Sequence, residues 1–226
     1  MIPAAYDAIA DWYDRSIRER TLLSASDRIA SALFETISDV DGLYLCDLAC
    51  GQGHMARQLA RRGARMVGVD LSQKLLEIAQ RDEDAGPLGI VYCHDDAQSL
   101  SSLGDTLFDG VVCNLALMDI PDLAATLRSA QRILRPGGWF AAAITHPCFQ
   151  IPPGRRYDDE GFWLSDNPHG VRGQVGAHHR TLSTYLNSLT EVGLILQRLV
   201  EPLIPDRETP PILVMHAAKP SERRMK

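Results

Sequence analysis

The segment LCDLACGQG, residues 45–53, combines one acidic side chain with small residues at alternate positions. Asp47 lies in an apolar run, and Ala49, Gly51 and Gly53 follow at every second position. Small residues allow a tight turn and a close approach of backbone to ligand, and a carboxylate binds cations and hydroxyl groups. The spacing predicts a strand, a glycine turn and the start of a helix, which together bind ligands at the carboxyl end of a parallel strand.

Two kinds of ligand fit this turn. Gly51, Gly53 and Ala56 match the relaxed dinucleotide fingerprint, and Asp70 follows Gly51 at nearly the ribose-binding spacing of an NAD enzyme. A pyrophosphate is negatively charged, however, and Asp47 with further acids at the neighbouring strand ends would repel it. S-adenosylmethionine suits acidic surroundings better, because its amino group and its sulfonium are both positive. Charge therefore favours S-adenosylmethionine over NAD.

Strand-like and helical segments alternate along the chain. Strands are expected at residues 43–48, 66–69, 90–93, 111–115, 139–144, 194–200 and 212–217. Helices are expected at residues 54–62, 72–83, 122–134 and 182–192. This alternation is typical of a parallel sheet with helices on both faces. We therefore predict an α/β fold with a doubly wound sheet.

Two segments flank this core in what we expect to be a single domain, residues 1–226. Residues 1–40 have helical periodicity and predict an N-terminal helical lid, followed by the ligand-binding core at 41–145. Residues 146–180 are rich in proline and glycine, without periodicity, and predict a lid inserted after the fifth strand. Residues 181–220 then complete the sheet.

Several segments occur in an order that is shared with a known family. They are LCDLACGQG, VGVDLS, HDDAQSL, FDGVVCNLALMDIPD, LRPGGWF and the final PPILVMHAAKP. With them, residues 40–220 resemble the class I, Rossmann-like S-adenosylmethionine-dependent methyltransferases; Ala49 stands where many members have glycine. The resemblance implies S-adenosyl-L-methionine as cofactor and a seven-stranded, mostly parallel sheet with an antiparallel last strand.

The resemblance also implies which residues bind the cofactor. Asp47 would bind the methionine amino group, Asp70 the ribose hydroxyls and Asp96 the adenine amino group, while Asn114 borders the sulfonium. Asp70 has the alternative role of capping the following helix. The full predicted set is Asp47, Ala49, Gly51, Gly53, Asp70, Leu71, Asp96, Ala97, Asn114 and Leu115.

Aromatic residues gather in the two flanking segments. Seven of the 14 aromatic residues fall within residues 1–20 and 146–165. An aromatic cover suits a flat or apolar small molecule, and the resemblance likewise points to natural-product methyltransferases of secondary metabolism. The alternative is that these rings only fasten helix to sheet. The predicted acceptor-binding residues are Tyr6, Trp12, Tyr13, Phe149, Tyr157 and Trp163.

Histidines are the first candidates for a catalytic base. His146 ends the fifth strand, and His178 and His179 precede a helix that could face the same cleft. An imidazole titrates near neutral pH, which suits removal of a proton from a phenol or an ammonium group. Each histidine has the alternative of a structural hydrogen bond. Asp119 and Tyr157 are secondary candidates, and a carbon or low-pKa amine acceptor would need no strong base.

Composition excludes several classes of partner. The net charge of -6 disfavours nucleic acid, and without an apolar run of roughly 18 residues we expect no membrane span or secretion signal. Five cysteines without disulfide or zinc spacing fit a reducing cytoplasm and predict no metal site. The N-terminal helices and the insertion offer surfaces for a second subunit, so a homodimer is one expected arrangement. Two other functions stay open: an NAD(P)-dependent oxidoreductase, or a catalytically silent S-adenosylmethionine-binding protein.

Overall fold

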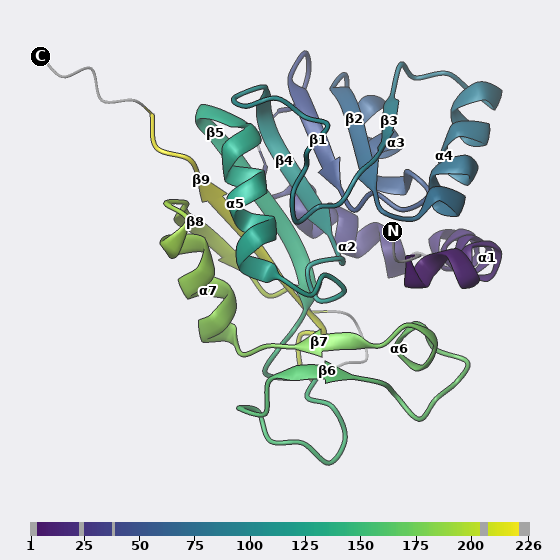
Figure 1. Ribbon diagram of the computed structural model, residues 1–226, viewed down its shortest axis with the longest axis vertical. Helices are drawn as coiled ribbons and strands as arrows, with labels where there is room; N and C mark the ends of the chain where they lie inside the picture. The colour runs from purple at the N-terminus through teal and green to yellow at the C-terminus, as the bar shows by residue number, and fades with distance from the viewer. Residues whose placement is uncertain (1–3, 23–24, 38, 204–207, 222–226) are drawn as a thin grey trace, which may run out of the picture.

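The centre of the protein is a seven-stranded sheet, shown in Figure 1. The computed structural model describes residues 4–22, 25–37, 39–203 and 208–221. The strand order is β3-β2-β1-β4-β5-β9-β8, and β9 alone runs antiparallel to its neighbours, as predicted. The strands are β1 (Tyr44–Leu48), β2 (Arg65–Asp70), β3 (Val91–His94), β4 (Phe108–Asn114), β5 (Leu134–Thr145), β8 (Ile195–Val200) and β9 (Ile212–Ala218).

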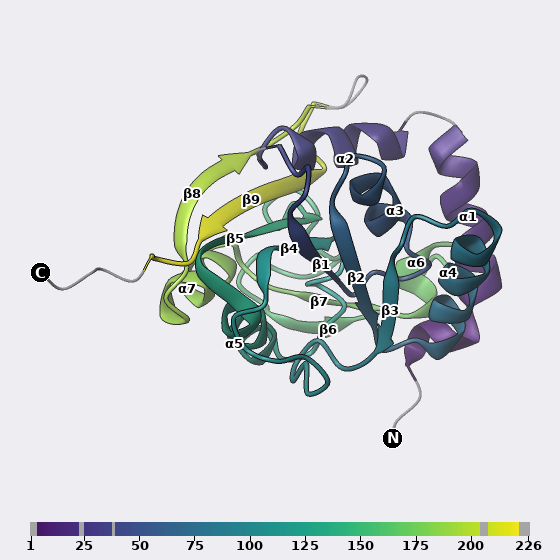
Figure 2. The same ribbon diagram turned by 90° about the horizontal axis from the view of Figure 1, so that it is seen from above.

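Helices cover both faces of this sheet, as Figure 2 shows from above. On β1, Leu45 shares a buried cluster with Leu33 and Leu59, whereas the adjacent Cys46 belongs to the opposite cluster with Leu127. Apolar residues therefore occupy successive strand positions, because each face is covered. One layer contains α2 (Ala25–Phe34) and α3 (His54–Ala60), and the other contains α5 (Leu123–Ile133) and α7 (Leu182–Glu191).

The N-terminal segment lies beside α4 (Gln73–Ala85). It consists of a short 3-10 helix, η1 (Ala5–Ala8), and α1 (Ala10–Leu22). Asp7 accepts hydrogen bonds from the Ser72 hydroxyl at 2.7 Å and from the Lys74 amide at 3.2 Å, which fastens η1 to the start of α4.

The insertion after β5 contains more regular structure than its composition predicts. Strands β6 (Gly161–Trp163) and β7 (Ala177–His179) pair antiparallel, and α6 (Val171–Gln174) lies between them. Figure 1 shows this insertion below the carboxyl ends of the sheet strands. The His178 amide donates to the Met118 carbonyl at 2.7 Å, so a partner 60 residues away holds β7 in place. The periodicity of the local sequence cannot predict a contact over this distance, so the strand pair was not expected.

Candidate functional site

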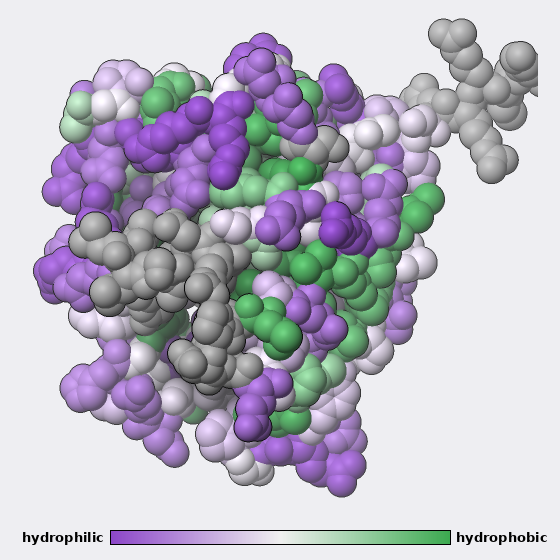
Figure 3. All heavy atoms as spheres, turned by 180° about the vertical axis from the view of Figure 1, so that it is seen from behind, coloured by the Kyte–Doolittle hydropathy of each residue, from purple (hydrophilic) through white to green (hydrophobic). Residues whose placement is uncertain are grey.

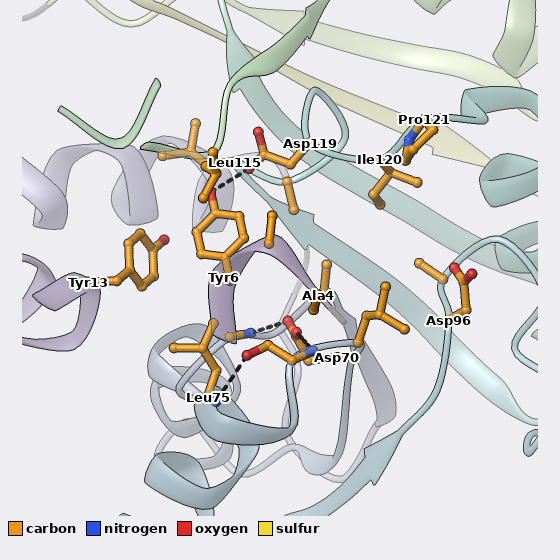
Figure 4. Close-up of a pocket in the computed structure, with 18 of the residues that line it drawn as sticks. Ala4, Tyr6, Tyr13, Asp70, Leu75, Asp96, Leu115, Asp119, Ile120 and Pro121 are labelled. Atoms are coloured by element: carbon orange, nitrogen blue, oxygen red, sulfur yellow. Dashed lines mark hydrogen bonds between the residues drawn. The ribbon is translucent and has the colours of Figure 1, made fainter. Parts of the chain in front are cut away.

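A cleft, here called the strand-end cleft, lies at the carboxyl ends of the parallel strands (Figure 4). The strand order reverses between β1 and β4, and ligands of open α/β sheets bind at such a point. The loops after β1, β2, β3 and β4 and the N-terminal segment line it. Among its lining residues are Tyr6, Tyr13, Asp47, Ala49, Gly51, Asp70, Leu71, Ser72, Leu75, Asp96, Ala97, Asn114, Leu115 and Asp119.

The turn after β1 has left-handed backbone at alternate positions. Ala49, Gly51 and Gly53 have φ of 56°, 56° and 80°. At Gly53, a Cβ would also lie 2.2 Å from the Tyr92 hydroxyl oxygen, so a larger residue would force the Tyr92 side chain to move. Gly53 starts α3 and does not line the cleft, whereas Ala49 and Gly51 do. The alternation of small residues thus reflects the backbone that the turn requires.

Two buried oxygens at the ends of β1 and β4, beside the cleft, lack hydrogen-bond partners in the described part of the chain. They are Asp47 Oδ2 and Asn114 Oδ1. The pKa of Asp47 is raised to about 8, mainly because burial removes its hydration. The Ala56 amide lowers this pKa in part, and the negative charge of the nearby Asp70 raises it. Such orphaned acceptors are costly in a folded protein. They fit a ligand that brings a positively charged donor, as the amino group of S-adenosylmethionine does.

Asp70 connects the end of β2 to the glycine turn. Its Oδ2 accepts from the Gly51 amide and its Oδ1 from the Ser72 amide, both at 2.7 Å. Burial raises the pKa of Asp70, and these bonds oppose the shift. The cap of α4 is Ser72, whose hydroxyl oxygen accepts from the Leu75 amide at 3.2 Å. Each carboxylate oxygen of Asp70 can accept a second hydrogen bond, for example from a ribose hydroxyl.

The two adjacent acids in the loop after β3, Asp95 and Asp96, have different surroundings. Asp95 accepts from the Ser102 amide at 2.7 Å and from its hydroxyl at 2.6 Å, so it holds the loop together. Asp96 lines the cleft together with Ala97, and its Oδ1 accepts from the Gln98 amide at 2.8 Å. Asp96 is therefore the acid that lies where a ligand can reach it.

Two tyrosines of the N-terminal segment line the cleft opposite these acids. Tyr6 and Tyr13 pack edge to face, with ring centroids 5.1 Å apart. The Tyr6 hydroxyl donates to Asp119 Oδ2 at 2.8 Å, and Asp119 Oδ1 pairs with Arg172 of the insertion. Figure 4 shows Tyr6 pointing toward Asp119. One carboxylate thus joins the N-terminal segment to the insertion.

A second hollow, here called the insertion cavity, lies between the insertion and the end of β5. It brings together four of the residues predicted to act on an acceptor: Phe149, Trp163, His178 and His179. Arg172 also lines it, so the Asp119–Arg172 pair lies between this cavity and the strand-end cleft. The remaining lining residues are Met118, Thr145, Pro147, Gln150, Ile151, Pro153, Ser165, Ala177, Arg180 and Tyr185.

Three other predicted residues line neither hollow. Trp12 is half-buried on α1. The Tyr157 hydroxyl accepts from the Leu182 amide at 2.7 Å, at the start of α7. His146 is 1% exposed; its Nε2 pairs with Glu201 at 2.7 Å, and its Nδ1 accepts from the Cys148 amide at 3.2 Å. Their predicted roles in acceptor binding and catalysis stay predictions.

Two arginines of the site, Arg172 and Arg180, have roles that the sequence pattern does not predict. Arg180 is buried and donates to the carbonyls of Leu117, Ile120 and Pro121 at 2.9, 2.6 and 2.7 Å, which shapes the loop containing Asp119. Arg172 lies in the irregular insertion, and only its contact across 53 residues reveals it. In the described segments, no helix is long and apolar enough to span a membrane, and no group of three His, Cys, Asp or Glu side chains could bind a metal.

Comparisons with known proteins agree with this geometry. A family model described as a methyltransferase domain matches residues 46–142. The crystal structure of an S-adenosylmethionine-dependent methyltransferase from Mesorhizobium loti is 31% identical, with a TM-score of 0.72, over 83% of this chain and 96% of that chain.

Curated relatives are ubiquinone biosynthesis O-methyltransferases. One from Leptothrix cholodnii is 28% identical over 57% of this chain, and one from Stutzerimonas stutzeri is 29% identical over 88% of this chain and 96% of its own length. The match spans 55% of the Leptothrix relative, about half its length.

Proposed function

The chain belongs to the S-adenosylmethionine-dependent methyltransferases, and from this premise we propose that it methylates a small aromatic or apolar acceptor held beside the strand-end cleft. The observation that carries the proposal is the pair of buried oxygens of Asp47 and Asn114, which have no partner among the described residues, in a cleft lined by aromatic side chains. The oxidoreductase alternative is set aside, because the family model and the similar crystal structure are both of methyltransferases.

We propose the cofactor-binding roles that the family resemblance implies, and the position of these residues in the cleft supports them. Asp47 and Asn114 hold the amino group, Asp70 accepts from the ribose hydroxyls, and Asp96 accepts from the adenine amino group. Leu71, which is 37% exposed, packs on the adenine. When bound, S-adenosylmethionine supplies an electrophilic methyl group on a positively charged sulfur. The chain contributes alignment and exclusion of water, which supply most of the catalysis in such a transfer.

The acceptor is proposed to occupy the insertion cavity with its reacting atom toward the strand-end cleft. Phe149, Trp163 and Tyr185 give this cavity aromatic walls, and Met118 adds an adaptable apolar contact. The names of the curated relatives specify O-methylation, which supports an oxygen acceptor. Of the predicted histidine bases, His178 and His179 line this cavity and His146 does not.

The experiment is methyl transfer from labelled S-adenosylmethionine to a panel of phenols, indoles, anilines and aliphatic alcohols. We expect transfer to one or more aromatic classes, and loss of transfer in Asp47→Asn. Asp84→Asn, at an exposed carboxylate of α4, is the matched control and retains activity. Binding of S-adenosylhomocysteine without transfer to any acceptor would favour the catalytically silent protein instead.

A homodimer is proposed through the edge strand β8. Figure 3 shows apolar side chains gathered on the face of the molecule to which β8 contributes. Ile195 and Leu199 on β8 are 57% and 39% exposed, and Leu203 beyond it is 69% exposed. Exposed apolar groups on an edge strand favour association. Light scattering on the parent and on Ile195→Lys should give a dimer and a monomer; a monomeric parent would contradict the proposal.

A further inference from the structure

We propose that Asp119 is a catalytic residue, which binds the hydroxyl group of the acceptor and takes its proton, and that the acceptor is therefore a phenol. This inference rests on the proposed function, since it names the acceptor class of the same site. It is carried by one juxtaposition: a buried carboxylate in the strand-end cleft already holds a phenol, the side chain of Tyr6.

Two arginines fix the position of Asp119. It lies in the loop that follows Asn114, the last residue of β4, and Leu115; by the family resemblance these two residues border the sulfonium. Arg180 anchors this loop through three carbonyls, and Arg172 pairs with Asp119 Oδ1. With 15% of its side chain exposed, Asp119 is shielded from solvent but open to the cleft. Preorganisation of this kind is what a group that acts on a bound hydroxyl needs.

The contact with Tyr6 shows that Asp119 can accept a hydrogen bond from a phenolic hydroxyl group. The Tyr6 hydroxyl donates to Asp119 Oδ2 at 2.8 Å, while Oδ1 stays with Arg172. Burial raises the pKa of Asp119, and the charge of Arg172 lowers it again. A phenolic acceptor can therefore replace the Tyr6 hydroxyl on Oδ2 without breaking the pair with Arg172. In this view Tyr6 occupies the hydroxyl site until the acceptor displaces it.

The histidines are placed less favourably for this task. His146 has both ring nitrogens engaged, and His179 Nε2 lies 2.8 Å from the Tyr157 carbonyl oxygen. His178 has a pKa lowered by burial and lines the insertion cavity, but it does not line the strand-end cleft. Asp119 lines the cleft where the methyl group is delivered.

Methyl transfer to the phenol needs no reagent besides the acceptor, S-adenosylmethionine and Asp119. The acceptor oxygen forms a bond to the methyl carbon as the bond from that carbon to sulfur breaks, and the sulfur keeps the electron pair. The phenolic proton moves to the carboxylate of Asp119, which later releases it to solvent. The products are an aryl methyl ether and S-adenosylhomocysteine.

The test measures phenol binding calorimetrically in the presence of saturating S-adenosylhomocysteine, so that no turnover occurs. The probe is phenol itself, and anisole, which lacks the hydroxyl, is the control ligand. We expect Asp119→Asn to weaken phenol binding about 10-fold or more, as loss of a charge-assisted hydrogen bond implies, with anisole binding unchanged. Tyr6→Phe should act in the opposite direction and tighten phenol binding severalfold, because no internal hydroxyl then competes.

The two variants keep the inference falsifiable even if one of them folds poorly. Equal phenol affinity in the parent and Tyr6→Phe would overturn it, as would a parallel loss of phenol and anisole binding in Asp119→Asn. A turnover loss confined to His178→Ala would also overturn it. Failure of the parent to bind S-adenosylhomocysteine would instead refute the proposed function, so the two failures are distinguishable.

Discussion

Replacement of Asp47 by Asn should stabilise the protein without its cofactor while it weakens cofactor binding. Asp47 is 1% exposed, and its Oδ2 has no partner among the residues that the structure describes. Burial raises its pKa from 3.8 to about 8. The folded state therefore keeps a proton that the unfolded chain releases above pH 3.8, and stability falls as pH rises through this window.

The magnitude follows from the same shift. At pH 7 the folded carboxyl is mostly protonated while the unfolded one is ionised, a difference on the order of 4 kcal/mol at 1.36 kcal/mol per pKa unit. Asn has no ionisation and keeps an oxygen for the Ala56 amide. We expect Asp47→Asn to exceed the parent in free energy of unfolding by about 1–4 kcal/mol at pH 7, and by little at pH 4.

The assay is urea unfolding followed by circular dichroism at pH 4, 5, 6, 7 and 8 without cofactor, with Asp84→Asn as the surface control. The difference between Asp47→Asn and the parent should grow with pH, whereas the control should track the parent. In the same variant, S-adenosylhomocysteine affinity should fall about 30-fold or more, because its amino group loses a buried charge partner. A stability difference that is independent of pH, or a variant less stable than the parent at pH 7, would refute the reasoning.

Three further changes test the architecture around the site. Gly53→Ala should cost about 1–3 kcal/mol in thermal unfolding, because φ is 80° and the Tyr92 hydroxyl is 2.2 Å from the added carbon, and Tyr92→Phe should restore part of it; an unchanged melting temperature would contradict this. Arg180→Met leaves three carbonyls without donors and should destabilise by about 3 kcal/mol or more; retention of parental stability would show that the loop needs no anchor. Ser72→Ala removes the cap of α4 and should cost about 1 kcal/mol, measured by urea unfolding, and equal stability would refute that role.

The sheet and its turn could be predicted because their signals are local. Strands covered on both faces are apolar at most positions, so β1, β4 and β5 can be recognised in the sequence as apolar runs. The turn after β1 needs small residues at Ala49, Gly51 and Gly53 because their φ angles are positive. The ends of α4 and α5 coincide with capping residues, Ser72 and Asp122.

The acceptor side could not be predicted to the same depth, because long-range contacts create it. Arg172 finds Asp119 across 53 residues, and Tyr6 reaches the same carboxylate across 113. Composition shows that aromatic residues gather in the two flanking segments, but it could not separate Tyr6, which lines the cleft, from Trp12, which does not. Composition also could not show that His146 is buried with both ring nitrogens in hydrogen bonds, unlike the exposed ring that a catalytic base needs.

The most direct measurement is the thermal stabilisation of the protein by S-adenosylmethionine, S-adenosylhomocysteine, NAD and NADP in parallel. A ligand that binds only the folded state at a hundredfold excess over its Kd adds about 2.7 kcal/mol of stability. We predict a shift with the two adenosyl ligands alone, reduced in both Asp47→Asn and Asp70→Asn. A shift with NAD or NADP and none with the adenosyl ligands would contradict the assignment of the strand-end cleft.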